Sequence, residues 1–309
     1  MTSKPRRKGK SKWKRLLIAF VSIFFLCIIA CIIVVVMRPQ QTIMYILHSD
    51  FVSRYCDDIN EKININEISN SEPGNKYIRL AVQYLEELSI KPILPTATFY
   101  GIDVSSHQGN IKWNDVAINY DFVSREITNK NATNSRKIDF AIAKATEGKT
   151  FTDSYLSDNR DGIRQAGIVF GAYHYFSLNS SPEEQALHFI RKCGLRNGDM
   201  VPILDFEETG KLDDDELRRR VLTWLRIVGE HFNCKPIIYT NSKLRTKLLS
   251  TPEFDNYDFW IAQWYVTRPK CDFTLWQFTD NGRSSGIKGR VDMNAYFADR
   301  ADFQKLLLQ

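Results

Sequence analysis

Two carboxylates stand two residues apart at the end of an apolar run, within the segment 202–208. The run 200–204 has the composition of a β-strand, and alternate side chains of a strand point to the same face. Asp205 and Glu207 are therefore expected on one face, with Cα atoms roughly 6.5–7 Å apart. Two acids this close should differ in pKa, because the like charge raises one and leaves the other ionised. Glycoside hydrolysis requires such a pair; the alternative is a strand end with two solvated acids.

The elements that would position these acids form an alternating pattern from residue 99 onward. Short apolar runs alternate with helical stretches, which is typical of a parallel α/β sheet or barrel. Strands are expected at 100–104, 140–144, 169–175, 201–206, 236–239, 259–263, 274–278 and 289–292, and helices at 153–166, 182–193, 212–232 and 242–249. The pattern predicts an eight-stranded α/β barrel with helices mainly in its first five units and three tightly connected strands at its end.

Polar and aromatic residues mark nearly every expected strand end. In such barrels the catalytic groups lie at the C-terminal ends of the strands. Acids at these positions would surround one mouth with negative potential, which suits a substrate that becomes cationic: Asp103, Asp205, Glu207 and Asp292. Candidates for binding sugar are His174, Tyr175, Tyr239, Gln263, Trp264, Trp276 and Gln277. The alternatives are core packing for the aromatic residues and a hydrogen-bonded histidine below the rim for the imidazole.

The segment 100–109, YGIDVSSHQG, resembles the opening signature of the family 25 glycoside hydrolases, the Chalaropsis-type lysozymes. Further motifs follow in the family's order: AKATEG at 143–148, GAYHYF at 171–176, LDFE at 204–207, YTN at 239–241, WIAQW at 260–264, LWQF at 275–278 and VDMN at 291–294. The resemblance extends from residue 99 almost to the C-terminus. It leaves out residues 1–98 and a polar, Asn-rich insertion at 124–137, which we expect to be a surface loop.

The resemblance implies a modified (β/α)5(β)3 barrel over residues 98–309 and muramidase activity, the hydrolysis of the β-1,4 bond from N-acetylmuramic acid to N-acetylglucosamine in peptidoglycan. It implies that Glu207 is the general acid and that Asp205 orients or stabilises the 2-acetamido group of the substrate. Asp103 and Asp292 would line the same cleft, and no metal or organic cofactor is implied. Two alternatives remain: a catalytically silent tether that binds peptidoglycan, and a chitinase-like N-acetylhexosamine hydrolase.

The N-terminal part predicts a membrane anchor. Residues 1–15 carry eight Lys and Arg and no acid, and residues 16–37 are free of charge. A helix of this length is about 33 Å long, enough to cross a hydrocarbon core of about 30 Å. The basic residues precede the span, so the N-terminus is expected in the cytoplasm and everything after Arg38 across the membrane. A cleaved signal peptide and a lipoprotein site ending at Cys31 are the alternatives.

The remaining charge argues against nucleic acid as a partner. The net charge is +6, but without the eight basic residues at the N-terminus 34 of the 42 remain against 36 acids. The globular part therefore lacks the basic surface of a nucleic-acid binder. Residues 38–97 are expected to form a stalk with one amphipathic helix at 77–90. Cys56, Cys193, Cys234 and Cys271 lie beyond the span, either disulfide-bonded or as buried thiols.

Overall fold

The computed structural model describes residues 92–129, 131–264 and 266–309, all within a compact unit that spans Lys91–Gln309. The expected cytoplasmic tail, the expected membrane span at 16–37 and the expected helix at 77–90 lie outside the described residues. Among the residues described, none of the helices combines the length and the apolar character needed to cross a membrane. Cys193, Cys234 and Cys271 carry free thiols.

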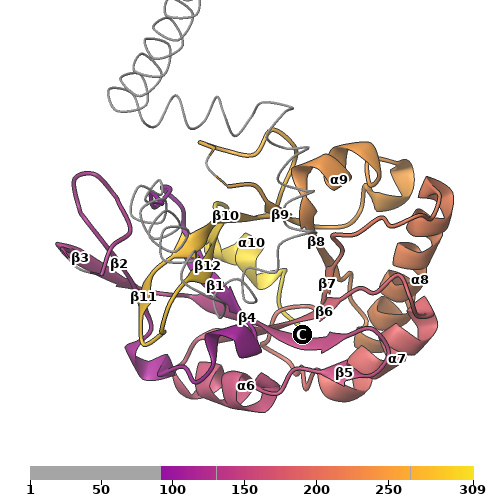
Figure 1. Ribbon diagram of the computed structural model, residues 1–309, viewed down its shortest axis with the longest axis horizontal. Coiled ribbons are helices and arrows are strands. Elements are labelled where there is room, and N and C mark those ends of the chain that lie inside the picture. The colour runs from indigo at the N-terminus through magenta and orange to yellow at the C-terminus, as the bar shows by residue number, and fades with distance from the viewer. Residues whose placement is uncertain (1–91, 130, 265) are drawn as a thin grey trace, which may run out of the picture. The chain divides into compact units, whose positions relative to one another are not determined.

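Eight strands of the described chain close into a barrel, which confirms the expected α/β architecture (Figure 1). They are β1 (Phe99–Val104), β4 (Phe140–Glu147), β6 (Val169–Tyr175), β7 (Ile203–Asp205), β8 (Ile237–Asn241), β9 (Phe259–Ala262), β10 (Leu275–Gly282) and β12 (Val291–Tyr296). Their order is β1-β12-β10-β9-β8-β7-β6-β4, and a parallel pairing of β1 with β4 closes the ring. Strand β12 runs antiparallel to both of its neighbours, β1 and β10, whereas the other barrel pairings are parallel.

Four helices connect the parallel strands and cover the outside of the barrel (Figure 1). They are α6 (Leu156–Gln165), α7 (Pro182–Lys192), α8 (Asp214–Phe232) and α9 (Ser242–Lys247), each within the expected range. Helix α7 shows why the sequence marks its start: the Ser181 side chain accepts a hydrogen bond from the Glu184 amide at 3.1 Å, and proline follows the cap. Between β1 and β4 the described residues form no α-helix, so the expected five-unit pattern is not complete there.

That first connection instead contains a small antiparallel sheet. Strand β3 (Asn134–Lys137) pairs with β2 (Ala117–Tyr120), and β11 (Ser284–Ser285) adds to the other edge of β2. A short strand β5 (Phe151–Thr152) also folds back on β4. The expectation of a surface loop over 124–137 is therefore wrong for its last four residues. Their polar sequence gave no strand pattern, because this sheet draws on backbone pairing rather than on a continuous apolar face.

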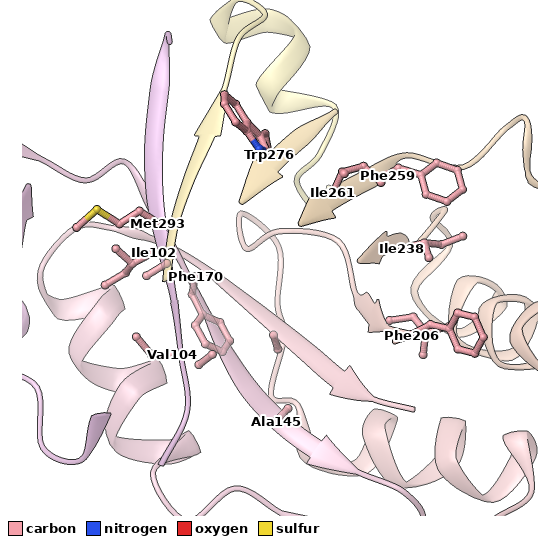
Figure 2. Close-up of a cluster of buried hydrophobic side chains, with 14 of the residues drawn as sticks. Ile102, Val104, Ala145, Phe170, Phe206, Ile238, Phe259, Ile261, Trp276 and Met293 are labelled. Atoms are coloured by element: carbon pink, nitrogen blue, oxygen red, sulfur yellow. The ribbon is translucent and has the colours of Figure 1, made fainter. Parts of the chain in front are cut away.

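Two sets of buried side chains alternate along every barrel strand. One set faces outward and packs beneath the helices; Figure 2 shows members of it from each strand, among them Ile102, Phe170, Ile238 and Trp276. The other set points inward and includes Phe140, Ile203 and Leu275. The inward set fills one end of the barrel together with α10 (Arg300–Gln304) and the C-terminal residues. The same inward positions, continued toward the C-terminal strand ends, carry the polar site.

One glycine permits this close packing. A Cβ on Gly101, which lies in β1, would approach Phe140 Cε2 to 2.3 Å. Any larger residue would displace the Phe140 ring, which is fully buried inside the barrel. Glycine is therefore required two residues before Asp103, and it holds β1 and β4 at the spacing that brings their strand ends to one mouth.

Candidate active site

The four predicted acids meet in one cavity of about 280 Å³ at the C-terminal ends of the parallel strands. Asp205 and Glu207 both reach it from the end of β7, as their spacing predicted. Asp205 is 7% exposed, whereas Glu207 is open to solvent. The remaining lining residues come from the other strands and their following loops: Asp103, Ser105, His107, Lys144, Tyr173, Tyr175, Tyr239, Trp260, Trp264, Asp280 and Asp292.

Asp292 reaches the mouth by a different route from the one expected. The sequence predicts a strand at 289–292 that ends on this acid, but β12 covers Val291–Tyr296 and Asp292 stands near its start. Because β12 runs antiparallel to β1, its first residues lie beside the last residues of β1, and Asp292 pairs with Asp103. The acid was placed correctly, while the direction of its strand was not.

A network of hydrogen bonds orients Asp103 from below. Asn294 Nδ2 and Gln277 Nε2 both donate to Asp103 Oδ2, at 2.8 and 3.0 Å. The Trp260 indole donates to Asn294 Oδ1 at 2.8 Å. The Tyr239 hydroxyl has one proton for two acceptors, Gln277 Oε1 at 3.1 Å and the Glu207 carboxylate. An indole N–H is a donor only, so it fixes which end of the amide faces it. The amide N–H groups are therefore directed at the Asp103 carboxylate.

Asp103 and Asp292 have unequal proton affinities. Burial raises the pKa of Asp103 to about 6, against the hydrogen bonds from Asn294 and Gln277, which favour its ionised form. Burial also raises the pKa of Asp292, to about 9, and the negative charge of Asp103 adds to this rise. A hydrogen bond between the two carboxyls lowers the pKa of Asp103 and raises that of Asp292. The two carboxyls therefore lose their protons in separate steps, and at neutral pH the pair holds one proton between them.

The pKa shifts of Asp205 and Glu207 differ from the sequence expectation in their cause and in their extent. Burial is the largest cause for both, and it raises the pKa of Asp205 well above its ordinary value and that of Glu207 to a lesser degree. The charge of Glu207 raises the pKa of Asp205 further, whereas a hydrogen bond with Tyr239 lowers that of Glu207. The expectation named the like charge as the cause of the difference in pKa, whereas burial, which acts on both carboxyls, contributes most.

Asp205 Oδ1 is buried and has no hydrogen-bond partner among the described residues. A buried acceptor without a partner costs about 1–3 kcal/mol, so such atoms are rare unless a ligand satisfies them. The nearby cation is Lys144, whose Nζ lies 2.6 Å from Glu147 Oε2 and 4.9 Å from the centre of the Tyr175 ring. Its charge lowers the pKa of Asp205 and of Glu207. The cavity therefore contains a buried acceptor, Asp205 Oδ1, that a ligand could satisfy. The positive charge of Lys144 partly neutralises the acids around it.

Tyr175, Tyr239 and Trp264 line the cavity as expected. The Trp264 ring is 37% exposed, and its indole donates to Gln277 Oε1 at 3.1 Å. The Tyr175 hydroxyl donates to Glu208 Oε1 at 3.0 Å. Gln277 lies one layer deeper, as a support for Asp103, rather than on the cavity wall.

Three expected binding residues lie outside the cavity. His174 is fully buried on the outer side of β6, where its imidazole contacts Thr146 Oγ1 at 2.7 Å and Gln185 Oε1 at 3.1 Å. Trp276 belongs to the outer layer, and its indole donates to the Gln263 carbonyl at 2.7 Å. Gln263 itself does not line the cavity. Each is the direct neighbour of a residue that faces inward, and adjacent strand side chains point to opposite faces.

The sequence reasoning missed Tyr173, Trp260, Asp280 and Asn294. Tyr173, Trp260 and Asp280 line the cavity, and Asn294 is the closer of the two amide donors to Asp103. Strand alternation contained the signal for most of them: Tyr173 stands two residues before Tyr175, Trp260 four before Trp264, and Asn294 two after Asp292. Asp280 follows irregular register between β10 and β12, which alternation does not predict.

The fold and the site define a class: an eight-stranded α/β barrel with a carboxylate-rich, aromatic-rimmed cleft, as glycoside hydrolases use. Residues 102–287 match the model of glycosyl hydrolases family 25. The chain belongs to this family, and it is a glycoside hydrolase. The matched segment contains Asp103, Asp205 and Glu207 and ends before Asp292.

Known proteins resemble the chain over most of its length. The YegX protein of Escherichia coli O6:H1 is 34% identical over 275 residues, 88% of each chain. Lysozyme M1 of Streptomyces globisporus is 28% identical over 72% of this chain and 78% of its own. The crystal structure of a bacterial lysozyme from Streptomyces coelicolor matches with a TM-score of 0.58 and 29% identity, over 69% of this chain and 98% of that one.

Proposed function

We propose that the protein is a lysozyme-like muramidase that hydrolyses the β-1,4 bond between N-acetylmuramic acid and N-acetylglucosamine in peptidoglycan. The observation that carries this assignment is the shared cavity of Asp205 and Glu207, with an unpartnered buried oxygen on the first and solvent access for the second. Similarity to Lysozyme M1, and to an N,O-diacetylmuramidase of Arthroderma benhamiae at 27% identity over 46% of this chain, supports the choice of substrate.

Glu207 is the proposed general acid. Its raised pKa keeps part of the population protonated closer to neutral pH than a free glutamate would be. Since it opens to solvent, it can donate this proton to the glycosidic oxygen and then exchange with water. Protonation of the leaving oxygen lowers the barrier to cleavage of the bond to the muramic acid C1.

Asp205 is the proposed partner of the 2-acetamido group. An amide N–H placed against Oδ1 would satisfy the buried acceptor and hold the acetamido oxygen toward C1. Burial and the charges of Glu207 and Asp103 raise the pKa of Asp205, and the charge of Lys144 opposes this rise. A carboxyl oxygen accepts an amide N–H in either protonation state. Asp103, which ionises near pH 6, adds negative potential where positive charge develops on the sugar.

Analysis of murein fragments tests the assignment. Purified murein is digested with the protein and with Glu207→Gln, while Glu230→Gln, a change at an exposed acid on α8 outside the cavity, serves as control. We expect products with muramic acid at the reducing end, and a loss of roughly 10²–10⁴-fold in rate for Glu207→Gln alone. Equal rates for both variants would remove Glu207 as the acid. Activity on chitin oligomers but not on murein would favour the chitinase-like alternative, and binding without any product would favour the tether.

We further propose that residues 16–37 anchor the enzyme in the cell membrane, with the N-terminus in the cytoplasm and the barrel on the periplasmic or extracellular side. The support is the length of the uncharged run and the eight basic residues before it. A tethered enzyme would cut only wall material that lies close to the membrane. Fractionation tests this: the full chain should sediment with membranes and resist extraction by carbonate, and recovery in the soluble fraction would contradict the anchor.

A further inference from the structure

A second groove begins at Glu207 and leads away from the acid cleft. It has a volume of about 390 Å³ and lies between α9 and the loop that joins β7 to α8. Glu207 lines both this groove and the cleft, so the two are continuous at the proposed acid. Leu212, Leu244 and Leu248 contribute apolar surface. The groove thus starts where the glycosidic bond would be cut.

One wall of the groove carries two cations that the fold does not use. Lys243 and Lys247 stand one helical turn apart on α9, so they share a face. Both are exposed, and neither forms an ion pair with a carboxylate among the residues described. Arg245, between them, is used structurally: it donates to the Leu249 carbonyl at 2.7 Å and lies over the Phe259 ring.

The position of Lys243 is unfavourable for the helix itself. It is the second residue of α9, and a cation near a helix N-terminus opposes the helix dipole. Two lysines four residues apart also repel each other. Lys247 lies in the last turn of α9, where a cation is favourable. Helix stability therefore does not explain Lys243, whereas an anionic ligand in the groove would. The opposite wall carries Asp214, so the groove offers separate sites for negative and positive groups.

We propose that this groove binds the peptide stem of the muramic acid unit, with stem carboxylates against Lys243 and Lys247. The proposal rests on the muramidase function above and names the part of the substrate that lies beyond the sugar. Peptidoglycan stems are short peptides that carry carboxylates, small apolar side chains and, in many walls, a free amine. These groups match the lysines, the leucine surface and Asp214 respectively.

Substrates matched in shape but not in charge test the proposal. Stem-bearing glycan strands are used with their carboxylates intact, or after amidation with carbodiimide and ammonium. The readout is the ratio of kcat/KM on intact and amidated strands, so a general loss of activity cancels. Each exposed charge contact is worth up to about fivefold. We expect the wild-type protein to prefer intact strands by roughly three- to tenfold at low salt, and this preference to shrink as salt increases.

Variants of the two lysines identify the source of this preference. Lys243→Ala with Lys247→Ala should bring the ratio close to one, and Lys243→Glu with Lys247→Glu should bring it below one. The matched control is Lys192→Ala with Lys235→Ala, two exposed lysines outside the groove, which should keep the wild-type ratio. Thermal unfolding of each variant checks that the fold is retained.

Four outcomes would overturn the proposal. A wild-type ratio near one, or a ratio that the groove variants leave unchanged, removes the stem from the groove while the muramidase function stands. A fall in the ratio for the control pair as large as that for the groove pair would assign the effect to overall charge. An absence of cleavage on either substrate would end the muramidase function, and the stem proposal with it.

Discussion

Replacing Asp103 with asparagine should stabilise the protein while it impairs catalysis. Asp103 is 9% exposed and has a pKa of about 6, compared with 3.8 for a free aspartate. Its folded-state pKa is raised, so its contribution to stability is fully present at low pH and is lost as the pH rises from 3.8 to 6. Asparagine resembles the protonated acid at all pH values, and its amide oxygen can accept the hydrogen bonds from Gln277 and Asn294.

The size of the effect follows from the shift in pKa. One pKa unit corresponds to about 1.4 kcal/mol, so ionisation of Asp103 costs about 3 kcal/mol at pH 7.5 and less than about 1 kcal/mol at pH 4. The pKa of Asp292 falls when the charge of Asp103 is removed, because that charge contributes to the raised pKa of Asp292. We therefore expect Asp103→Asn to raise the free energy of unfolding by about 1–3 kcal/mol at pH 7.5 and by less than about 1 kcal/mol at pH 4.

Urea denaturation followed by tryptophan fluorescence measures this difference at the two pH values. Asp255→Asn, an exposed aspartate outside the cavity, serves as control and should change neither value. Activity on murein should fall by about tenfold or more, since the variant lacks the negative charge near the developing cation. A variant that is no more stable than the wild-type protein at pH 7.5, or whose gain is the same at pH 4, would refute the assigned cost of burying this charge.

The other predictions concern two aromatic residues of the cleft wall and one of the outer layer. Tyr239→Phe removes the hydrogen bond that lowers the pKa of Glu207, so the alkaline limb of the pH profile of kcat/KM should move to higher pH; a shift to lower pH would contradict this. Trp264→Ala should raise KM for murein by about tenfold with little loss of stability, because its ring is exposed on the cavity wall. Trp276→Ala should do the reverse: about 3–5 kcal/mol of destabilisation, measured by denaturation, and an unchanged KM.

The sequence predicted the barrel well because the apolar runs of its strands are short and clearly separated. Every barrel strand overlaps its expected range, and the helices after β4, β6, β7 and β8 lie within theirs. The direction of β12 was not accessible in the same way. An isolated apolar run carries no mark of whether its neighbours run parallel or antiparallel, and no helix precedes β12 to distinguish it. The small sheet of β2, β3 and β11 was not predicted, because its strands are short and polar.

Side-chain direction separates the site residues that were placed correctly from those that were not. Naming both His174 and Tyr175, or both Trp276 and Gln277, as binding residues conflicts with strand alternation, because one member of each pair must face outward. The inward members were Tyr175 and Gln277. The alternation used for Asp205 and Glu207, applied to every strand, would have excluded His174, because His174 and Tyr175 must face opposite sides of β6. The extent of the pKa shifts, in contrast, depends on burial and was not readable from spacing.

The cleft keeps a costly arrangement of charges that the fold does not require. Burial raises the pKa of each of the four acids, and the charge of another of the four adds to this rise for three of them: Glu207 for Asp103 and Asp205, and Asp103 for Asp292. Among the residues that the structure describes, Asp205 Oδ1 has no hydrogen-bond partner. A barrel that only bound glycan could replace these acids with neutral hydrogen-bonding residues and become more stable, as we expect for Asp103→Asn. Retention of the full set is therefore an argument for catalysis over the silent tether: it is explained by a substrate that brings an amide N–H to Asp205 and a positive charge to the centre of the ring of acids.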